Sequence, residues 1–398
     1  MNEDQRRPIV VCEPIQVGPA HAPFNAGLLM VISAAWPGRI EFWAEPEHSA
    51  CVRELLPSAT SERFTFATHT PPPRHQPAHS RVGRDGVEAW KIVRNAVAVG
   101  ARKLVLSCGL PGTVIGAKLG LASVVPSRRP EAHVVMHSVL ADVWGWRSRN
   151  PLRCAIDMTG ALHWPTPSGF RLIILEISIA DELIRKLPAI ASQIIVLEHP
   201  IAETLHQPGA RRPGPLRVGF LGGASRIKGF DRYCALARMV AMRGGGAAFH
   251  VIGKSEPGAV TESDMAPLAS RPQYVPLDRP KFIERLLELD LVIMLHDTEF
   301  YAHTPSGVLL DALAAERPVL SLPNPLIDSL VARYGPIGPR VANLEAAAEA
   351  IAHLDVATLD QPEFSRYRAN LRRAAESRRP AVLATAYAQD EKVADNGY

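Results

Sequence analysis

Short apolar runs alternate with longer segments of helical periodicity along the whole chain. The strand-length apolar runs cover residues 9–12, 40–44, 64–67, 104–107, 133–137, 172–175 and 194–197 in the first half, and 217–221, 248–252, 273–275, 290–295 and 319–322 in the second. Segments with apolar residues at helical spacing lie between them, at 24–36, 51–56, 86–101, 113–119, 180–187, 230–242 and 281–289, and from Ser306 onward. Strands that alternate with helices are typical of parallel sheets. The pattern predicts an α/β protein with two Rossmann-like open parallel-sheet domains facing a cleft.

A turn-rich connector at 207–215, which contains three prolines and two glycines, separates the two halves. Such segments mark domain boundaries. We expect an N-terminal domain over 1–206, a C-terminal domain over 216–362, a helical segment over 363–391 that packs back on the body, and a disordered tail at 392–398. A proline-rich segment at 69–84 is interpreted as an exposed loop, which either shapes a binding site or is disordered.

Composition and charge narrow the class of protein. The 398 residues exceed what one compact core needs, and 44 lysines and arginines against 40 acidic residues give a net charge of +4. This small excess favours anionic ligands or a membrane surface over nucleic acid, so we expect no nucleic-acid partner. The five cysteines are scattered, without Cys-x-x-Cys or Cys/His ligand spacing, which fits a reducing cytosol. The N-terminus lacks an apolar export signal and no run approaches the roughly 20 apolar residues of a membrane span, so we expect a cytoplasmic protein.

The stretch from Glu299 to Pro318 lies between two predicted strands and carries the clearest candidate chemistry. A helix is expected to begin near Ser306, and the free N–H groups and positive dipole of a helix start bind anions. Gly307 would let a bulky anion approach closely. One turn further on, Asp311 offers a carboxylate to sugar hydroxyls, as ribose is commonly held in α/β nucleotide sites. Phosphate at the helix start and ribose one turn along indicate a nucleotide.

The second half resembles the nucleotide-binding half of GT-B glycosyltransferases, specifically the retaining family 4 type. The resemblance rests on the segments 218–231, 250–253 and 306–319, and it covers roughly residues 216–350. In the first half it touches only the Gly18 loop and the strand end at His137. The resemblance implies a GT-B fold, with a donor domain for the nucleotide sugar in the second half and an acceptor-side domain in the first.

The resemblance also implies roles for individual residues. Arg226 and Lys228 would clamp the donor diphosphate, and Ser306 with the Gly307 backbone would hold a phosphate. Asp311 stands where the family has the second of two glutamates, the one that binds ribose.

The first of those glutamates falls on His303, which is a departure from the family pattern. His303 contacts the donor sugar in place of the carboxylate, or it is a loop residue, or Glu299 has taken over the lost role. His137, at a strand end, is either a contact to the donor sugar or reacting centre, or a satisfied histidine. Gly18 and His21 act near the phosphates or the acceptor, or are ordinary loop residues.

Cations and N–H dipoles aimed at a leaving diphosphate stabilise charge that grows toward the transition state. Lys228 supplies a point charge and Arg226 a planar fork. The chain contains no Asp-x-Asp pair. We therefore expect a metal-independent reaction that needs no cofactor besides the nucleotide diphosphate sugar.

These observations predict transfer of a hexose-type sugar from a nucleotide-sugar donor to an acceptor hydroxyl, with retention at the anomeric carbon. The resemblance implies a carbohydrate or lipid-linked acceptor in polysaccharide biosynthesis. One cluster of Trp and Arg residues either makes peripheral contact with the inner face of the membrane or belongs to the core and its rim: Trp144, Trp146, Arg147 and Arg149. The alternatives are another GT-B sugar-nucleotide enzyme, such as an epimerase or hydrolase, and a non-catalytic nucleotide-sugar-binding protein.

Overall fold

The computed structural model describes residues 7–74, 78–137, 139–145, 147–203, 205, 213–256, 258, 260–355 and 357–395. The chain forms two compact units. The first runs to Ala202 and takes in His303–Pro305 and the segment from Arg378 onward, while the second holds Glu203–Ala302 and Ser306–Ser377. The chain thus passes from one unit to the other before the turn-rich segment at 207–215, of which residues 207–212 lie outside the described part.

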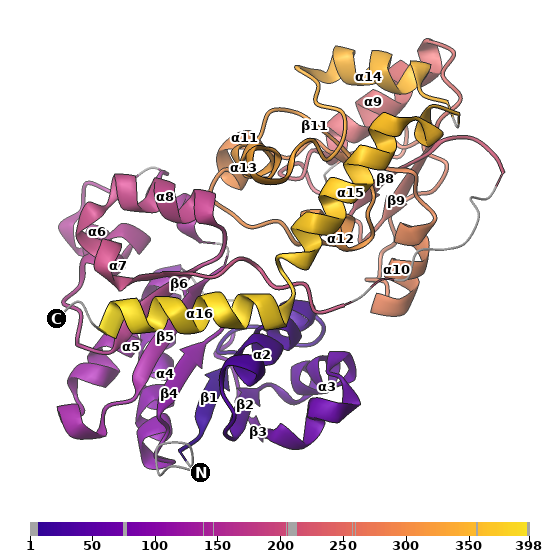
Figure 1. The fold of residues 1–398 in the computed structure, drawn as a ribbon. Helices are drawn as coiled ribbons and strands as arrows, with labels where there is room; N and C mark the ends of the chain where they lie inside the picture. The colour runs from indigo at the N-terminus through magenta and orange to yellow at the C-terminus, as the bar shows by residue number, and fades with distance from the viewer. Residues whose placement is uncertain are drawn as a thin grey trace. The chain divides into compact units, whose positions relative to one another are not determined.

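The first unit is built on a seven-stranded parallel sheet (Figure 1). Its strand order is β3 (Phe64–Thr68), β2 (Ile40–Ala44), β1 (Ile9–Cys12), β4 (Lys103–Leu106), β5 (Glu131–Met136), β6 (Phe170–Ile174) and β7 (Ile194–Val196). Its helices are α2 (Ala22–Ala35), α3 (Pro46–Leu55), α4 (Ala78–Ala98), α5 (Pro111–Ala122), α6 (Pro151–Ile156), α7 (Met158–His163), α8 (Ile177–Lys186) and α16 (Pro380–Asp395).

Both faces of this sheet are covered by helices. In β1, Val10 and Cys12 pack in the cluster that includes α4, α5, α7 and α8, whereas Ile9 and Val11 pack in the cluster that includes α2, α3 and α16. Successive residues of a strand point to opposite faces, so a strand buried on both faces is a continuous apolar run. For this reason, the buried strands could be recognised in the sequence as short apolar runs.

Helices α4 and α5 pack at unusually close range through glycines four residues apart. A Cβ atom at Gly116 would lie 2.0 Å from the carbonyl oxygen of Gly86, and one at Gly112 would lie 2.2 Å from that of Val82. This contact bears on a wrong prediction: a loop was expected over 69–84, but α4 begins at Ala78, so the segment 78–84 is helical. Its helical state depends on packing against α5, which local sequence does not reveal.

We expect Gly116→Ala to lower the free energy of unfolding by about 2 kcal/mol, because the added methyl group forces the two helices apart. The matched control is Gly83→Ala in α4, where a Cβ would meet nothing within 4 Å. That control should raise the stability by about 0.5–1 kcal/mol, since alanine is the better helix former. Urea denaturation of both variants checks the pair. Equal effects at the two positions would contradict the close packing.

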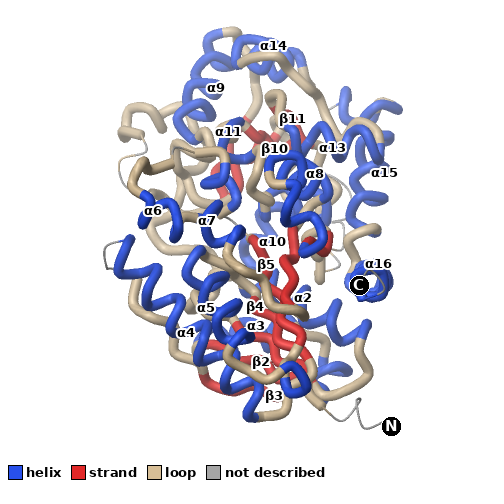
Figure 2. The backbone as a smooth tube through the Cα atoms, turned by 90° about the vertical axis from the view of Figure 1, so that its left-hand side faces the viewer, coloured by secondary structure: helices blue, strands red, loops and turns tan. Residues whose placement is uncertain are grey.

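The second unit has a four-stranded parallel sheet. The strand order is β11 (Val319–Ser321), β10 (Leu291–Met294), β8 (Arg217–Leu221) and β9 (Ala248–Ile252). Its helices are α9 (Phe230–Met242), α10 (Arg279–Leu287), α11 (Thr298–Tyr301), α12 (Gly307–Ala314), α13 (Pro325–Tyr334), α14 (Leu344–His353) and α15 (Pro362–Glu376). Side chains of β8 and β9 pack against α9, which lies beside α14 (Figure 2). The strand expected at 273–275 is absent: Gln273 forms an isolated bridge with Lys254, and Tyr274 and Val275 are exposed.

The C-terminal segment was expected to be helical over 363–391 and to pack back on the body. It forms α15 in the second unit and α16 in the first, where α16 lies beside α2 (Figure 1). Leu383, Ala384 and Tyr387 enter the core of the first unit, and the Tyr387 hydroxyl lies 2.5 Å from Nδ1 of His133. The helix continues to Asp395, beyond the start of the expected disorder at Lys392, and residues 396–398 lie outside the described part.

Each sheet has a point at which the strand order reverses, between β1 and β4 in the first unit and between β8 and β10 in the second. In open α/β sheets, ligands bind outside the carboxyl ends of the strands at such points. The residues that follow these four strands are therefore the ones to inspect.

Candidate functional site

Lys228 lies at the carboxyl end of β8 in the second unit. The residue after the strand, Gly222, has a φ of +84°, and a Cβ atom there would lie 2.9 Å from the Lys228 Nζ. The absence of a side chain at this position leaves room for the ammonium group beside the end of the strand. Burial lowers the pKa of Lys228, while the nearby carboxylates of Glu256 and Asp311 act in the opposite direction.

The loop that carries Lys228 is fixed to the end of β10, the neighbouring strand at the reversal point. The backbone N–H of Asp297 donates to the carbonyl of Ile227 at 2.8 Å. Gly229, with φ +76°, packs so closely on Leu295 that a Cβ would lie 2.0 Å from its carbonyl oxygen. The backbone of the loop that carries Lys228 is thus held against the end of β10.

The start of α12 has the expected anion-site geometry. Ser306 is the N-cap, and its side chain accepts a hydrogen bond from the N–H of Leu309 at 3.4 Å. The N–H groups of Gly307 and Val308, at the first two helical positions, have no carbonyl partner within the helix. Gly307 faces open space, since a Cβ there would meet nothing within 4 Å.

His296 lies two residues beyond the end of β10 and is buried. Burial, with a smaller contribution from the charge of Lys228, lowers the pKa of His296 to about 3. Its ring centroid lies 4.1 Å from that of Tyr301. A neutral imidazole beside Lys228 leaves the lysine as the cation at this strand end.

Asp311 projects from the second turn of α12 and is bound by Arg279, a residue that the sequence analysis missed. The Arg279 Nη2 lies 2.7 Å from Oδ1 of Asp311, and the aspartate side chain keeps 16% of its surface exposed. Burial raises the pKa of Asp311, and the charge of Arg279 opposes that shift. No local pattern marks a pairing between residues 32 positions apart.

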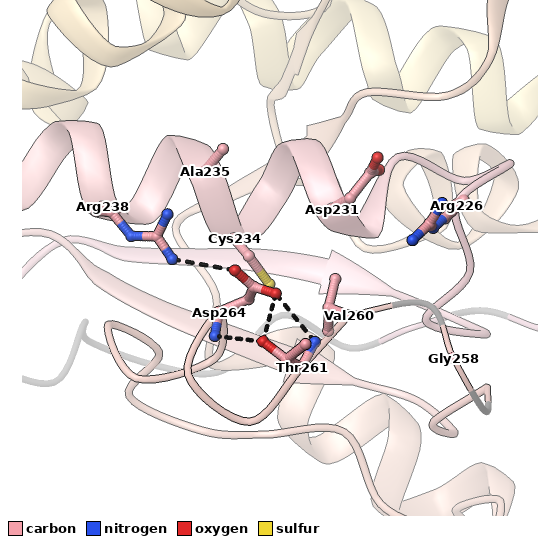
Figure 3. A pocket seen from close by; sticks show the side chains of 9 residues that line it. All are labelled: Arg226, Asp231, Cys234, Ala235, Arg238, Gly258, Val260, Thr261 and Asp264. Atoms are coloured by element: carbon pink, nitrogen blue, oxygen red, sulfur yellow. Dashed lines mark hydrogen bonds and ion pairs between the residues drawn. The ribbon is translucent and has the colours of Figure 1, made fainter.

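Arg226 lines a cavity of about 270 Å³ beside α9 (Figure 3). It shares this cavity with Asp231, Arg238 and Asp264, of which the last two form an ion pair at 3.3 Å. None of the other predicted site residues lines the cavity. The expected pairing of Arg226 with Lys228 in one clamp therefore remains a prediction.

In the first unit, Glu13 follows β1 and links the two strands at the reversal point. Its buried carboxylate accepts hydrogen bonds from Oγ of Ser107, which follows β4, at 2.8 Å and from Nδ2 of Asn25 at 3.0 Å. The same amide group of Asn25 lies 2.8 Å from Nε2 of His48. The sequence analysis missed this network, although an acidic residue directly after the first strand is a usable signal.

His137 lies in a cluster of aromatic rings at the end of β5. Its ring centroid is 4.2 Å from that of His21, 4.9 Å from Phe24 and 5.4 Å from His199. Both ring nitrogens of His137 are buried, and neither has a hydrogen-bond partner among the described residues. Burial holds the pKa of His137 well below its usual value, so the ring is neutral at physiological pH. Buried polar atoms are normally paired, so two unused nitrogens point to a ligand.

Gly18 adopts the left-handed φ of +57° and is tied to the segment after β2. Its N–H donates to Oε2 of Glu45 at 3.3 Å, and its carbonyl accepts from Nδ1 of His48 at 2.8 Å. The Gly18 N–H that was expected to contact a phosphate therefore already donates its hydrogen bond to the Glu45 carboxylate.

His303 belongs to the first unit, where its ring is stacked on Trp144 with centroids 3.6 Å apart and planes 4° apart. Burial lowers the pKa of His303. Glu299 is exposed on the short helix α11. Of the other residues named for membrane contact, Arg147 pairs with Asp157 at 3.1 Å, Arg149 is exposed, and Trp146 lies outside the described residues.

Within the described part of the chain, no group of three or more His, Cys, Asp or Glu side chains could hold a metal ion. No helix among the described residues has the length and apolar character to cross a membrane.

No protein-family model and no curated protein matches the sequence. Among solved structures, the chain is similar to a glycosyltransferase from Rickettsia africae, with a TM-score of 0.65, 10% identity and 98% of each chain covered. Anabaena HepE in complex with UDP and glucose gives 0.64 at 14% identity, over 98% of this chain and 100% of that one. An E. coli structure of trehalose-6-phosphate bound with UDP-2-fluoro glucose gives 0.63 at 10% identity, over 97% and 99%. At these identities the likeness concerns the fold, and the chain has the GT-B fold of glycosyltransferases.

Proposed function

We propose that this protein transfers a hexose-type sugar from a nucleotide diphosphate sugar to an acceptor hydroxyl. The observation that carries the proposal is the arrangement after β8: an ammonium group held against a glycine strand end, with the charge of Asp311 acting on it. The open N-terminus of α12 adds N–H dipoles for phosphate.

The proposed reaction is one in which the diphosphate leaves as the bond to the sugar breaks. Lys228 and the first N–H groups of α12 would stabilise the negative charge that develops on the phosphate oxygens. Because these donors are fixed before the reaction, they need no reorganisation at the transition state. In this account the leaving group is stabilised without a metal ion.

His137 would contact a hydroxyl of the donor sugar as a neutral imidazole, which has one donor and one acceptor nitrogen. Its two unpaired nitrogens support this role. The lowered pKa of His137 means that it would not act as a general acid at neutral pH. Retention at the anomeric carbon and a carbohydrate or lipid-linked acceptor belong to the same proposal.

Uridine is the first base to try, because two of the similar structures were solved with UDP or a UDP sugar. The test incubates the protein with UDP-glucose, GDP-mannose or ADP-glucose and follows release of the nucleoside diphosphate with and without carbohydrate and lipid-linked acceptors. Acceptor-dependent release supports the proposal, and NMR of the product gives the anomeric configuration. Release of the nucleoside diphosphate at the same rate with and without acceptors would indicate a hydrolase. Interconversion of the donor sugar would indicate an epimerase, and nucleotide binding without turnover would indicate a non-catalytic protein.

A further inference from the structure

Arg279 joins two carboxylates in the second unit and belongs to none of the groups discussed for the reaction. It lies at the first position of α10, directly after the N-cap Asp278. Its guanidinium holds Glu203 through Nε, at 3.1 and 2.9 Å from the two oxygens, and through Nη2 at 2.5 Å. The same Nη2 holds Oδ1 of Asp311 at 2.7 Å.

The hydrogen-bonded ion pair with Glu203 restricts the orientation of the Arg279 side chain. A carboxylate bound through two nitrogens sets both the position and the plane of a guanidinium. The arginine and Glu203 side chains are 24% and 22% exposed, so the pair is screened less than a surface pair. The ring of Phe282 lies 5.2 Å from the guanidinium carbon. The edge that faces Asp311 is therefore held in place.

Asp311 needs such a partner if it is to act as an acceptor. Burial favours the neutral acid, and the charged groups that face Asp311 are Arg279 from α10, Glu203 from the segment after the unit boundary, and Lys228 from the loop after β8. Arg279 and Lys228 favour the carboxylate and Glu203 disfavours it. Arg279 engages Oδ1 of Asp311, and the aspartate side chain keeps 16% of its surface exposed, so the second oxygen, Oδ2, is the one left for a ligand in the inference that follows.

We propose that Arg279 is a positioning residue that keeps Asp311 ionised, with Oδ2 presented to a ribose hydroxyl, and thereby makes the site selective for ribonucleoside over 2′-deoxyribonucleoside diphosphates. This inference rests on the proposed function. A site built to accept a hydrogen bond from a hydroxyl rejects the analogue that lacks it, because the buried acceptor is then left unpaired.

The test compares dissociation constants of UDP, GDP and ADP with those of their 2′-deoxy counterparts, from neutral to mildly acid pH. For the base that binds best, the wild type should prefer the ribose form by about tenfold. Arg279→Gln should bring that ratio close to one. As the pH is lowered, the variant should also lose its affinity at a higher pH than the wild type does, because removing the cation raises the pKa of Asp311 further. Arg279→Lys should recover part of the selectivity, because lysine restores the positive charge but not the planar, two-donor geometry of the guanidinium.

The matched control is Arg271→Gln in the same unit, where Arg271 pairs with Glu262 at 2.7 Å and both side chains are more than half exposed. This variant should behave as the wild type.

Glu203→Gln leaves Arg279 in place but weakens the contact that fixes its guanidinium. This variant should give an intermediate ratio of the two dissociation constants, and it tests the inference if Arg279→Gln does not fold. An unchanged ratio and pH profile in both the Arg279 and Glu203 variants would overturn the inference, as would a wild type without ribose preference. A wild type that binds no nucleoside diphosphate would instead overturn the proposed function.

Discussion

Replacing Lys228 by methionine should weaken the binding of a nucleoside diphosphate by about 100-fold, since hydrogen bonds to charged groups contribute about 1.5–3 kcal/mol. Methionine keeps the length and volume of the side chain and removes only the charge. The melting temperature of the free protein should stay the same or rise, because a partly buried ammonium group with a lowered pKa is costly to keep. Isothermal titration with UDP and a thermal melt measure the two effects.

The control for this variant is Lys281→Met, in which the replaced side chain is 66% exposed and lies 3.6 Å from Asp278. It should leave the affinity within about twofold, as exposed ion pairs contribute little. If Lys228→Met binds as tightly as this control, the anion site does not depend on Lys228 and the account of the β8 strand end is wrong.

Replacing Arg378 by methionine should destabilise the first unit by about 3–5 kcal/mol, the range found when one partner of a buried ion pair is removed. Arg378 is 1% exposed, and its Nη2 lies 2.7 Å from Glu176 and 3.1 Å from Glu198. The substitution leaves both carboxylates buried without their cation. The midpoint of urea denaturation, followed by circular dichroism, should fall accordingly.

Two further variants separate charge from packing at Arg378. Arg372→Met removes an exposed arginine that pairs with Glu316 at 2.7 Å, and it should cost no more than about 1 kcal/mol. Adding Glu176→Gln and Glu198→Gln to Arg378→Met should recover part of the loss, because the uncompensated charges are then gone. A single Arg378 variant as stable as the Arg372 variant would show that the buried triad does not hold the C-terminal segment.

The sequence predicted the sheets better than it predicted the contacts between distant residues. The strands Ile9–Cys12, Arg217–Leu221 and Ala248–Ile252 were predicted to the residue. Ile9–Cys12 is buried on both faces and is therefore a continuous apolar run, whereas the other two strands are mainly apolar and each contains one polar residue, Arg217 or His250. The apolar pair Tyr274 and Val275 is exposed, so the same rule failed there. Apolar character alone does not say whether a segment finds a neighbour to pair with.

The candidate site was predictable where chemistry and local structure coincide. Ser306 as a helix cap and the open position at Gly307 follow from a few neighbouring residues, and the structure shows both. The Arg279 contact to Asp311, the stack of Trp144 on His303 and the packing of His199 near His137 depend on the fold. These contacts join residues far apart in sequence, so no spacing rule could have indicated them.

The measurement that tests the central claim most directly is a crystal structure of the protein soaked with UDP or with the nucleoside diphosphate that binds best. The account predicts phosphate oxygens within hydrogen-bond distance of Nζ of Lys228 and the N–H of Gly307, with a ribose hydroxyl on Asp311. Density for the nucleotide away from Lys228 and the start of α12, for example beside Arg238 and Asp264, or none at all at saturating ligand, would contradict it.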